Sequence, residues 1–407
     1  MPLCEGMEEY MQPQSRRSHV ATIKGEYLVS DVHIASKRRS RFGRTLGATL
    51  AVGAALSLSA VSVASAAPAS QRSPQYNHGF TTMAKSKIKI AIIAGGPNVV
   101  FAPWGVVAKL LSKQLGITVT FVVPPTPTYA ASVETATIDS LVAKGYNAFG
   151  VFPDGEAAIT PTYQRLIDRG IPVFDLAGCT TDPTPADLCF ATDVRASAQY
   201  ETQVLIKAMG GKGNVAFLTG ELTDANTIQR EDGVKAAIAA TDGKVTLAQV
   251  VSNIDTPSAA PPAVESLLAS KGSTLTGMLS TDYYPSVAAA SVLTKNKQFR
   301  HILFIGQDND PTVMNAIAAH AIYGTMYQNL YGQAYVATMW LYKMLANGCT
   351  ISKTAPFIDA SGTKHFIDSG YFFVGQSQVS KYIGQPENVP TATSQVLAET
   401  SKFLSCP

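Results

Sequence analysis

Charged residues are scarce in this 407-residue chain, at 15% against 46% hydrophobic residues. Average soluble domains carry about 25% charge, so disorder driven by excess charge is excluded. The formal net charge of +3 comes from residues 1–66, with 8 basic and 5 acidic side chains, whereas residues 67–407 hold 24 of each. This neutral balance argues against a nucleic-acid partner, which would require a basic face.

Motifs of catalysis and cofactor binding are also missing from the sequence. There is no C-x-x-C pair, no G-x-S-x-G nucleophile turn and no G-x-G-x-x-G after a strand. The histidines beyond residue 66 are scattered without metal-ligand spacing; they are His78, His301, His320 and His365. We therefore expect a protein that is not an enzyme and has neither cofactor nor metal.

The N-terminal region has the order of features typical of a secretory signal. A basic cluster at 37–44 precedes an uncharged run at 46–63, and Ala-Ser-Ala follows at 64–66. We predict a signal peptide over 37–66, cleaved near Ala66, in a leader of residues 1–66. A membrane anchor is the alternative, since about 18 uncharged residues could just span a bilayer. A further hypothesis is an over-extended gene start, with Val32 as an alternative initiator.

Four cysteines remain after the leader, an even number that suggests disulfides in an exported chain. They allow three pairings, and buried free thiols are the alternative. We favour Cys179–Cys189, which are close in sequence across a Pro/Asp/Thr turn, and Cys349–Cys406, which would hold the C-terminal tail.

Short apolar runs alternate with helical patterns beyond a flexible lead-in at 67–86. This alternation predicts parallel sheets with helices on both faces. The predicted strands are 89–94, 118–123, 148–152, 171–175, 214–218, 245–251, 275–280, 302–306, 322–327 and 371–374. The rhythm restarts after Asp193, so we predict an α/β protein of two doubly wound parallel-sheet domains.

Several segments, taken together and in order, resemble the periplasmic sugar-binding proteins of ABC importers, in the ribose-binding-like branch of the type I fold. They are the helix and strand entry at 138–148, Gly170-Ile171-Pro172-Val173, Gln229-Arg230-Glu231-Asp232-Gly233-Val234, Gly306-Gln307-Asp308 and Thr325-Met326-Tyr327-Gln328. The resemblance covers about residues 87–385. It implies two lobes joined by a three-segment hinge that close over one ligand.

The resemblance also sets the expected boundaries. The N-terminal lobe would comprise 87–193 plus 329–360, and the C-terminal lobe 194–328 plus 361–385. Residues 386–407 would form a tail. The chain would cross between lobes near Asp193, near Gln328-Asn329 and between about Ile351 and Asp368.

Polar and aromatic side chains follow successive predicted strands, as a site for sugar hydroxyls and apolar sugar faces requires. Those that the resemblance suggests as ligand residues are Asn98, Phe101, Trp104, Asp154, Arg230, Asp282, Tyr284, Asp308 and Gln328. Arg230 offers a rigid fork of donors. Alternatives stay open: core packing for Trp104, helix caps for Asp154 and Asp282, a solvated helix position for Arg230, and Tyr283 in place of Tyr284.

These features predict an exported protein that binds a small neutral polyhydroxylated solute, a monosaccharide or sugar alcohol, and delivers it to an ABC permease. It would act as a monomer in the periplasm. The alternative is a sensory binding protein that presents a small ligand to a membrane receptor. An exported hydrolase and a sugar-responsive repressor are weaker rivals, because the chain shows neither a nucleophile–base set nor a DNA-binding N-terminus.

Overall fold

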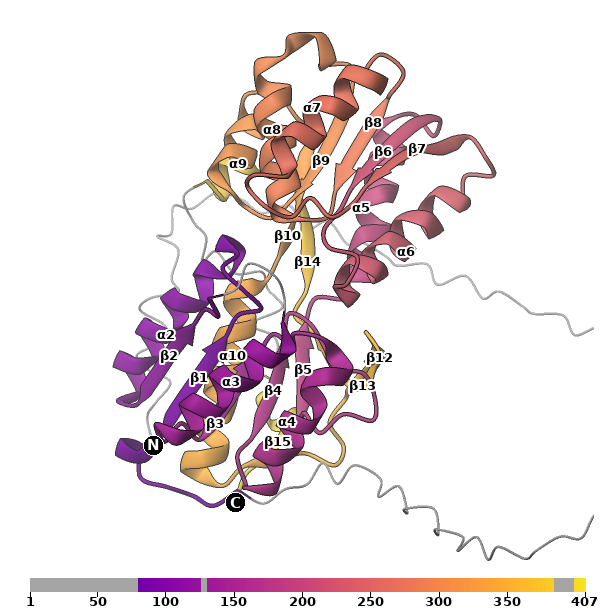
Figure 1. Ribbon diagram of the computed structural model, residues 1–407. Helices are drawn as coiled ribbons and strands as arrows, with labels where there is room; N and C mark the ends of the chain where they lie inside the picture. Colours follow the sequence, from indigo (N-terminus) through magenta and orange to yellow (C-terminus); the bar gives the residue numbers. More distant parts are fainter. Residues whose placement is uncertain (1–79, 126–129, 384–398) are drawn as a thin grey trace, which may run out of the picture. The chain divides into compact units, whose positions relative to one another are not determined.

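A computed structural model describes residues 80–125, 130–383 and 399–407. By its internal contacts the chain divides into a unit of residues 1–69 and a unit of residues 70–407. The first unit lies outside the described residues, and so do the predicted signal peptide and most of the predicted lead-in. All elements below belong to the second unit (Figure 1).

The first sheet has seven strands in the order β12-β13-β5-β4-β3-β1-β2, and all pairings are parallel except β12 with β13. The strands are β1 (Lys89–Ile93), β2 (Thr118–Val122), β3 (Ala148–Val151), β4 (Val173–Leu176), β5 (Leu188–Ala191), β12 (Ile358–Ala360) and β13 (Thr363–Asp368). Strands β3, β4 and β5 are buried at every position, as expected for a parallel sheet covered on both faces.

Helices cover both faces of this sheet. Ile90 and Ile92 of β1 pack with α2 (Ala102–Leu115) and α10 (Leu330–Asn347). Their neighbours Ala91 and Ile93 pack on the opposite face with α3 (Ala131–Ala143) and α4 (Glu156–Asp168). This alternation follows from the two-residue period of a strand. Helix α10, drawn in orange in Figure 1, lies among the indigo and purple elements of the N-terminal part.

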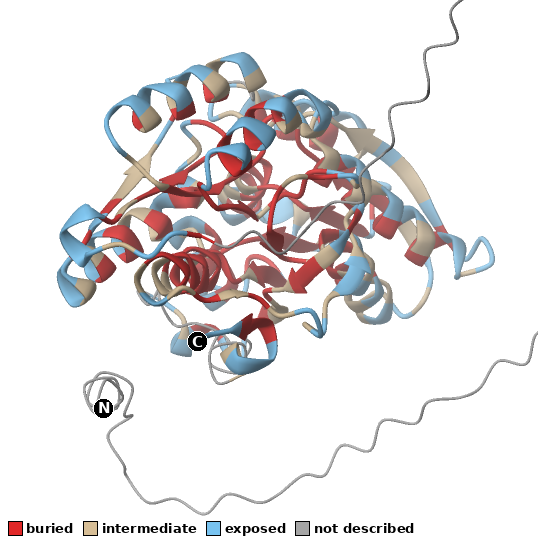
Figure 2. Ribbon diagram, turned by 90° about the horizontal axis from the view of Figure 1, so that it is seen from below, coloured by how far each residue is buried: buried red, intermediate tan, exposed pale blue. Residues whose placement is uncertain are grey.

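The second sheet has six strands in the order β14-β10-β9-β8-β6-β7, and only β14 runs antiparallel to its neighbour. The strands are β6 (Gly213–Leu218), β7 (Val245–Val251), β8 (Gly277–Ser280), β9 (Leu303–Gln307), β10 (Gly324–Gln328) and β14 (Tyr371–Gly375). One face packs with α7 (Ala260–Lys271), α8 (Tyr283–Lys295) and α9 (Pro311–Ala318), and the other with α5 (Val194–Ala208) and α6 (Ala225–Ala239). In Figure 2 the central strands and inner helix faces are buried, whereas edge strands are partly exposed and the outer helix faces are exposed. These two sheets confirm the predicted fold class.

The chain passes three times between the sheets, and one buried serine touches all three passages. Ser369, between β13 and β14, shares a hydrogen bond of 3.1 Å with the Thr192 hydroxyl after β5. Its backbone carbonyl accepts from Asn329 Nδ2 at 2.9 Å, and its hydroxyl accepts from Gln333 Nε2 at 3.0 Å. The three crossings are therefore tied to one another at a single point.

Two features of the first sheet differ from the sequence-based expectation. Strand β5 lies between the predicted strand 171–175 and the predicted start of the second unit, where no strand was expected. The hairpin of β12 and β13 also belongs to the first sheet, because β13 pairs with β5. The third crossing therefore lies at 369–370, later than the predicted lobe boundary at 360. Strands β5 and β12 are short and lie in Asp/Thr/Ser-rich segments, a composition that is typical of turns.

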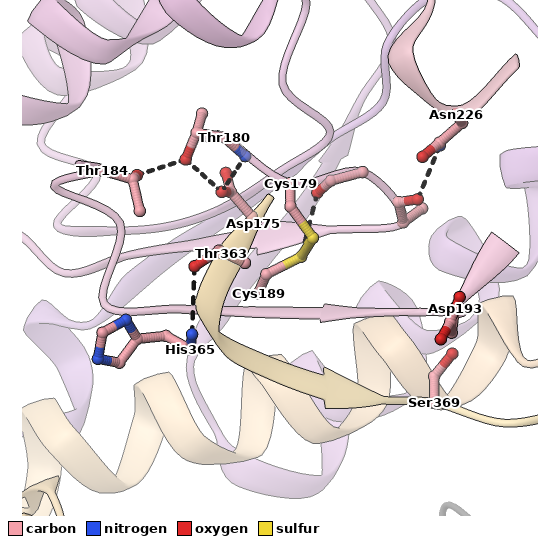
Figure 3. The surroundings of a disulfide bond; sticks show 12 residues. Asp175, Cys179, Thr180, Thr184, Cys189, Asp193, Asn226, Thr363, His365 and Ser369 are labelled. Carbon is pink, nitrogen blue, oxygen red and sulfur yellow. Dashed lines mark hydrogen bonds between the residues drawn. A yellow bond between two sulfur atoms is a disulfide. The ribbon is translucent and has the colours of Figure 1, made fainter. Parts of the chain in front are cut away.

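The structure joins the cysteines in the two pairs that we favoured. Cys179–Cys189 bridges the connection between β4 and β5 and lies close to the buried Asp175–Thr180 contact (Figure 3). Cys349–Cys406 joins β11 (Thr350–Ile351) to β15 (Leu404–Ser405) across a separation of 57 residues. The C-terminal residues are thereby held next to the end of α10.

Candidate functional site

One cavity of about 40 Å³ collects side chains from loops at the carboxyl ends of strands in both sheets. This is where ligands bind in doubly wound folds. We call it the first chamber. Its lining residues are Asn98, Val100, Phe101, Phe152, Ala177, Asp224, Asn226, Arg230, Asp255, Thr281, Asp282, Tyr283, Asp308, Gln328 and Leu330.

Arg230 is the basic side chain among these lining residues, and α6 carries it into the chamber. Its Nη1 donates to Asp282 Oδ1 at 3.4 Å, and its Nη2 donates to Gln328 Oε1 at 3.4 Å. Three residues further along α6, a Cβ on Gly233 would lie 2.2 Å from the Arg195 carbonyl oxygen. The R-x-x-G spacing therefore has a physical reason: glycine lets α6 approach α5 closely, and the arginine on the preceding turn reaches the strand ends.

Asp308 sits directly after β9 in the left-handed backbone region, with φ of 63°. Its backbone N–H donates to the Met326 carbonyl at 2.7 Å, and its Oδ1 accepts from Gln328 Nε2 at 2.9 Å. Gln328 thus binds both Asp308 and Arg230 from the end of β10. The amide fixes a carboxylate and a guanidinium side by side, a combination that offers both acceptors and donors to hydroxyl groups.

Carboxyl groups outnumber the guanidinium in the first chamber, where Asp224, Asp255, Asp282 and Asp308 surround Arg230. Burial raises the pKa of Asp282 to about 6, while the Arg230 charge opposes this rise. Burial also raises the pKa of Asp308 and Asp224. These acidic groups favour a guest that brings many hydrogen-bond donors.

A carboxyl group behind the chamber feels the same arginine. Glu201 on α5 is fully buried, and neither of its carboxyl oxygens has a hydrogen-bond partner among the described residues. Burial raises its pKa well above the ordinary value, and the Arg230 charge only partly opposes this. Glu201 therefore holds a proton more firmly than an exposed glutamate would.

Aromatic rings form the apolar part of the first chamber. The rings of Phe101 and Phe152 meet edge to face, with centroids 5.6 Å apart. Trp104 lies beneath Phe101, with centroids 4.8 Å apart, and is fully buried; its Nε1 donates to the Leu330 carbonyl at 2.9 Å. Phe101 and Phe152 are therefore available to cover an apolar face of a guest, and Trp104 supports Phe101 from below.

The structure brings together six of the nine predicted ligand residues in the first chamber. They are Asn98, Phe101, Arg230, Asp282, Asp308 and Gln328. Asn98 Nδ2 donates to Asp255 Oδ2 at 3.2 Å, so it links the loop after β1 to the loop after β7.

The other three predicted residues do not line the chamber. Trp104 packs in the core, as described above. Asp154 is 1% exposed: its N–H donates to Glu134 Oε2 at 2.8 Å, and its Oδ2 accepts from Ala130 N at 3.2 Å. Tyr284 packs against the core of the second sheet, whereas Tyr283 lines the chamber. Asp154, in the loop after β3, thus binds the start of α3 and does not line the chamber.

Several lining residues were not predicted from the sequence, chiefly Asp224, Asn226, Asp255 and Phe152. Asp224 caps α6, because its side chain accepts from Asn226 N. An Asp-x-Asn pair six and four residues before Arg230 was therefore a usable signal for the start of the helix. Asp255 lies in the loop after β7 within a Ser/Asn/Asp/Thr/Pro segment, which has no distinguishing pattern.

Buried Asp154 predicts how stability depends on pH. Burial raises its pKa from the ordinary 3.8 to about 7. The native state therefore keeps a proton between these values that the unfolded chain releases, so the free energy of unfolding falls as pH rises from about 4 to about 7. We expect Asp154→Asn to be about 2 kcal/mol more stable than wild type at pH 8 and to show a flatter pH profile.

Urea unfolding at pH 5 and pH 8 measures this effect. Asp168→Asn, at the exposed end of α4, the helix that follows Asp154 in the chain, is the matched control. Equal loss of stability between the two pH values in wild type and Asp154→Asn would contradict the prediction.

The described residues contain neither a cluster of three or more His, Cys, Asp or Glu side chains placed to bind a metal ion nor a helix long and apolar enough to cross a membrane.

Comparisons with known proteins agree with this fold. A family model described as periplasmic binding protein domain matches residues 88–348. The xylitol-binding protein of Mycolicibacterium smegmatis is 26% identical over 198 residues, which are 49% of this chain and 56% of that protein. The match thus spans little more than half the length of this relative.

Two solved structures show the same fold at low identity. An ABC transporter solute-binding protein from Burkholderia graminis, in complex with D-arabinose, has a TM-score of 0.64 and 19% identity, covering 74% of this chain and 99% of its own. One from Actinobacillus succinogenes with bound D-allose has a TM-score of 0.62 and 20% identity, covering 72% and 100%. Because the family model covers well over half of the chain, this protein belongs to the periplasmic binding protein domain family.

Proposed function

We propose that the protein is an exported solute-binding protein that captures a monosaccharide or sugar alcohol and delivers it to an ABC importer. One observation carries the proposal: Arg230, Asp282, Asp308 and Gln328 converge on a small chamber that also contains phenylalanine rings. Paired charged donors and acceptors recognise hydroxyl groups, and rings cover the C–H faces of a sugar.

The ligands of similar proteins belong to the same class. These proteins are described as binding xylitol or as complexes with D-arabinose or D-allose, which are neutral and polyhydroxylated. An uncharged guest with several hydroxyls can donate to the carboxyls and accept from Arg230 at the same time. In this proposal the lobes close about the three crossings, because contacts from both stabilise the closed state.

Export is the second part of the proposal and rests on the sequence of residues 37–66. The basic cluster, uncharged run and Ala-Ser-Ala motif would direct the chain to the periplasm, and cleavage would leave Ala67 as its first residue. The exported protein would act there as a monomer. An ABC permease in the inner membrane would be its partner.

Calorimetric titration of the exported protein against neutral sugars, alditols, amino acids and nucleosides tests the ligand class. We expect saturable binding of at least one sugar or alditol, and about 30-fold or greater weakening in Asp308→Ala, since removing one partner of a buried charged hydrogen bond costs at least about 2 kcal/mol. Binding of only amino acids or nucleosides would contradict the proposal while leaving the fold unaffected. Loss of uptake of that sugar on deletion of the gene would separate delivery from a sensory role.

A further inference from the structure

A second and larger cavity adjoins the first chamber. It has a volume of about 230 Å³, against about 40 Å³ for the first. Phe152, Asp224 and Asn226 line both cavities. These three side chains thus lie between two adjacent spaces, and we call the larger one the second chamber.

Part of the lining of the second chamber is apolar. The buried ring of Phe152 and Pro153 lie there, together with Cys179 of the disulfide and Ile228, which is 51% exposed. The chamber also holds the carboxyl groups of Glu156 and Asp224 and the amide of Asn226. Glu156 accepts a hydrogen bond from the Thr181 hydroxyl, and burial raises its pKa.

Contacts within the chain hold these walls in the arrangement that the structure shows. Asn226 Nδ2 donates to the Ala177 carbonyl at 3.0 Å, and Ala177 is held in the left-handed backbone region with φ of 62° (Figure 3). Cys179 is fixed by its bond to Cys189 on β5. A Cβ on Gly178 would lie 3.3 Å from the Phe152 ring, so the loop packs directly on that ring.

The chemistry of the second chamber selects its occupant. A wholly apolar group would leave the remaining acceptor capacity of the Glu156 and Asp224 carboxyls unused and cut off from water, which costs free energy. An anionic group would be repelled by Glu156 and Asp224. A hydroxylated ring satisfies both sides, since its C–H face covers Phe152 and Ile228 while its hydroxyls donate to the carboxyls.

We infer that the two chambers together bind a two-unit ligand, with one sugar or polyol unit beside Arg230 and a second sugar unit between Phe152 and Ile228. This inference rests on the proposed function and narrows its ligand to disaccharides and glycosylated polyols. The 40 Å³ of the first chamber then holds only the terminal part of the ligand, and Asp224 and Asn226 lie beside the linkage.

Calorimetric titration with matched probes tests the inference: D-xylose against xylobiose, D-glucose against maltose, and D-galactose against galactobiose. We expect at least one disaccharide to bind tenfold or more tightly than its monosaccharide. Ala225→Phe, which fills the second chamber from the first residue of α6, should weaken disaccharide binding at least tenfold and so erase the preference. Ala239→Phe, exposed at the far end of the same helix, is the matched control and should leave the preference intact.

A second variant keeps the test informative if Ala225→Phe does not fold. Ile228→Asp changes an exposed side chain of the apolar wall and should reduce the preference for the disaccharide severalfold. If monosaccharides or alditols bind and every disaccharide binds more weakly, the inference is overturned and the proposed function stands. The inference also fails if Ala225→Phe and Ala239→Phe show the same preference as wild type. If none of the sugars or alditols binds, the proposed function itself fails.

Discussion

Replacing Arg230 by alanine should weaken ligand binding roughly 30- to 4000-fold, which corresponds to about 2–5 kcal/mol for the loss of a buried charged hydrogen-bond partner. Arg230 is 9% exposed, and its guanidinium is the basic group that lines the first chamber among the described residues. Its removal leaves Asp282 and Gln328 without their shared donor. Four carboxyls would then face one another with no cation between them.

Calorimetric titration with the tightest-binding sugar or alditol measures this loss. Arg230→Lys should recover only part of the affinity, because an ammonium lacks the planar fork that reaches Asp282 and Gln328 together. Arg169→Ala, at the exposed end of α4, is the matched control for loss of an arginine. A folded Arg230→Ala protein with wild-type affinity would show that the ligand lies elsewhere.

Removing the disulfide between Cys349 and Cys406 should lower the free energy of unfolding by about 4 kcal/mol, because it closes a loop with a separation of 57 residues. The bond holds β15 against β11, and Phe403 beside it packs on Trp340 with ring centroids 5.3 Å apart. In the double variant Cys349→Ser/Cys406→Ser the unfolded chain is no longer held in a closed loop. In the folded protein the C-terminal segment is free to fray.

Urea unfolding of the double variant measures this change, and Cys179→Ser/Cys189→Ser is the comparison. The shorter loop of that second disulfide, with a separation of 10 residues, predicts a smaller loss of about 3 kcal/mol. An unchanged unfolding midpoint without the Cys349–Cys406 bond would contradict the prediction. Since the two bonds lie in different parts of the fold, the two losses should also add.

The sequence predicted those elements that bury a continuous apolar run. Strands such as β3 and β8 are buried at every position, so their hydrophobic pattern is complete without knowledge of the rest of the chain. Strand β13 could not be found this way. Its Lys364 is exposed and His365 half-buried, and its place depends on pairing with β5, a contact between segments about 175 residues apart.

The candidate site was predictable where a side chain directly follows a strand, as Asp308 does, or belongs to a recognisable pattern, as Arg230 does in R-x-x-G. Asp154 does not line the chamber, because Glu134 and the start of α3 supply partners that draw it into the N-terminal lobe. Choosing between Tyr283 and Tyr284 required the helix phase at the first turn of α8, which adjacent tyrosines do not reveal. Loop residues such as Asp255 can be assigned to the site only once β7 is known to pair with β6.

The serine that joins the three crossings constrains how this protein can move. Thr192, Asn329 and Gln333 all bond to Ser369, and Gly370 beside it adopts a φ of 86°. Sliding one sheet past the other would break all of these bonds at once. We therefore expect the three segments of the connection to turn together, with Ser369 as their common contact, when the lobes open and close as proposed.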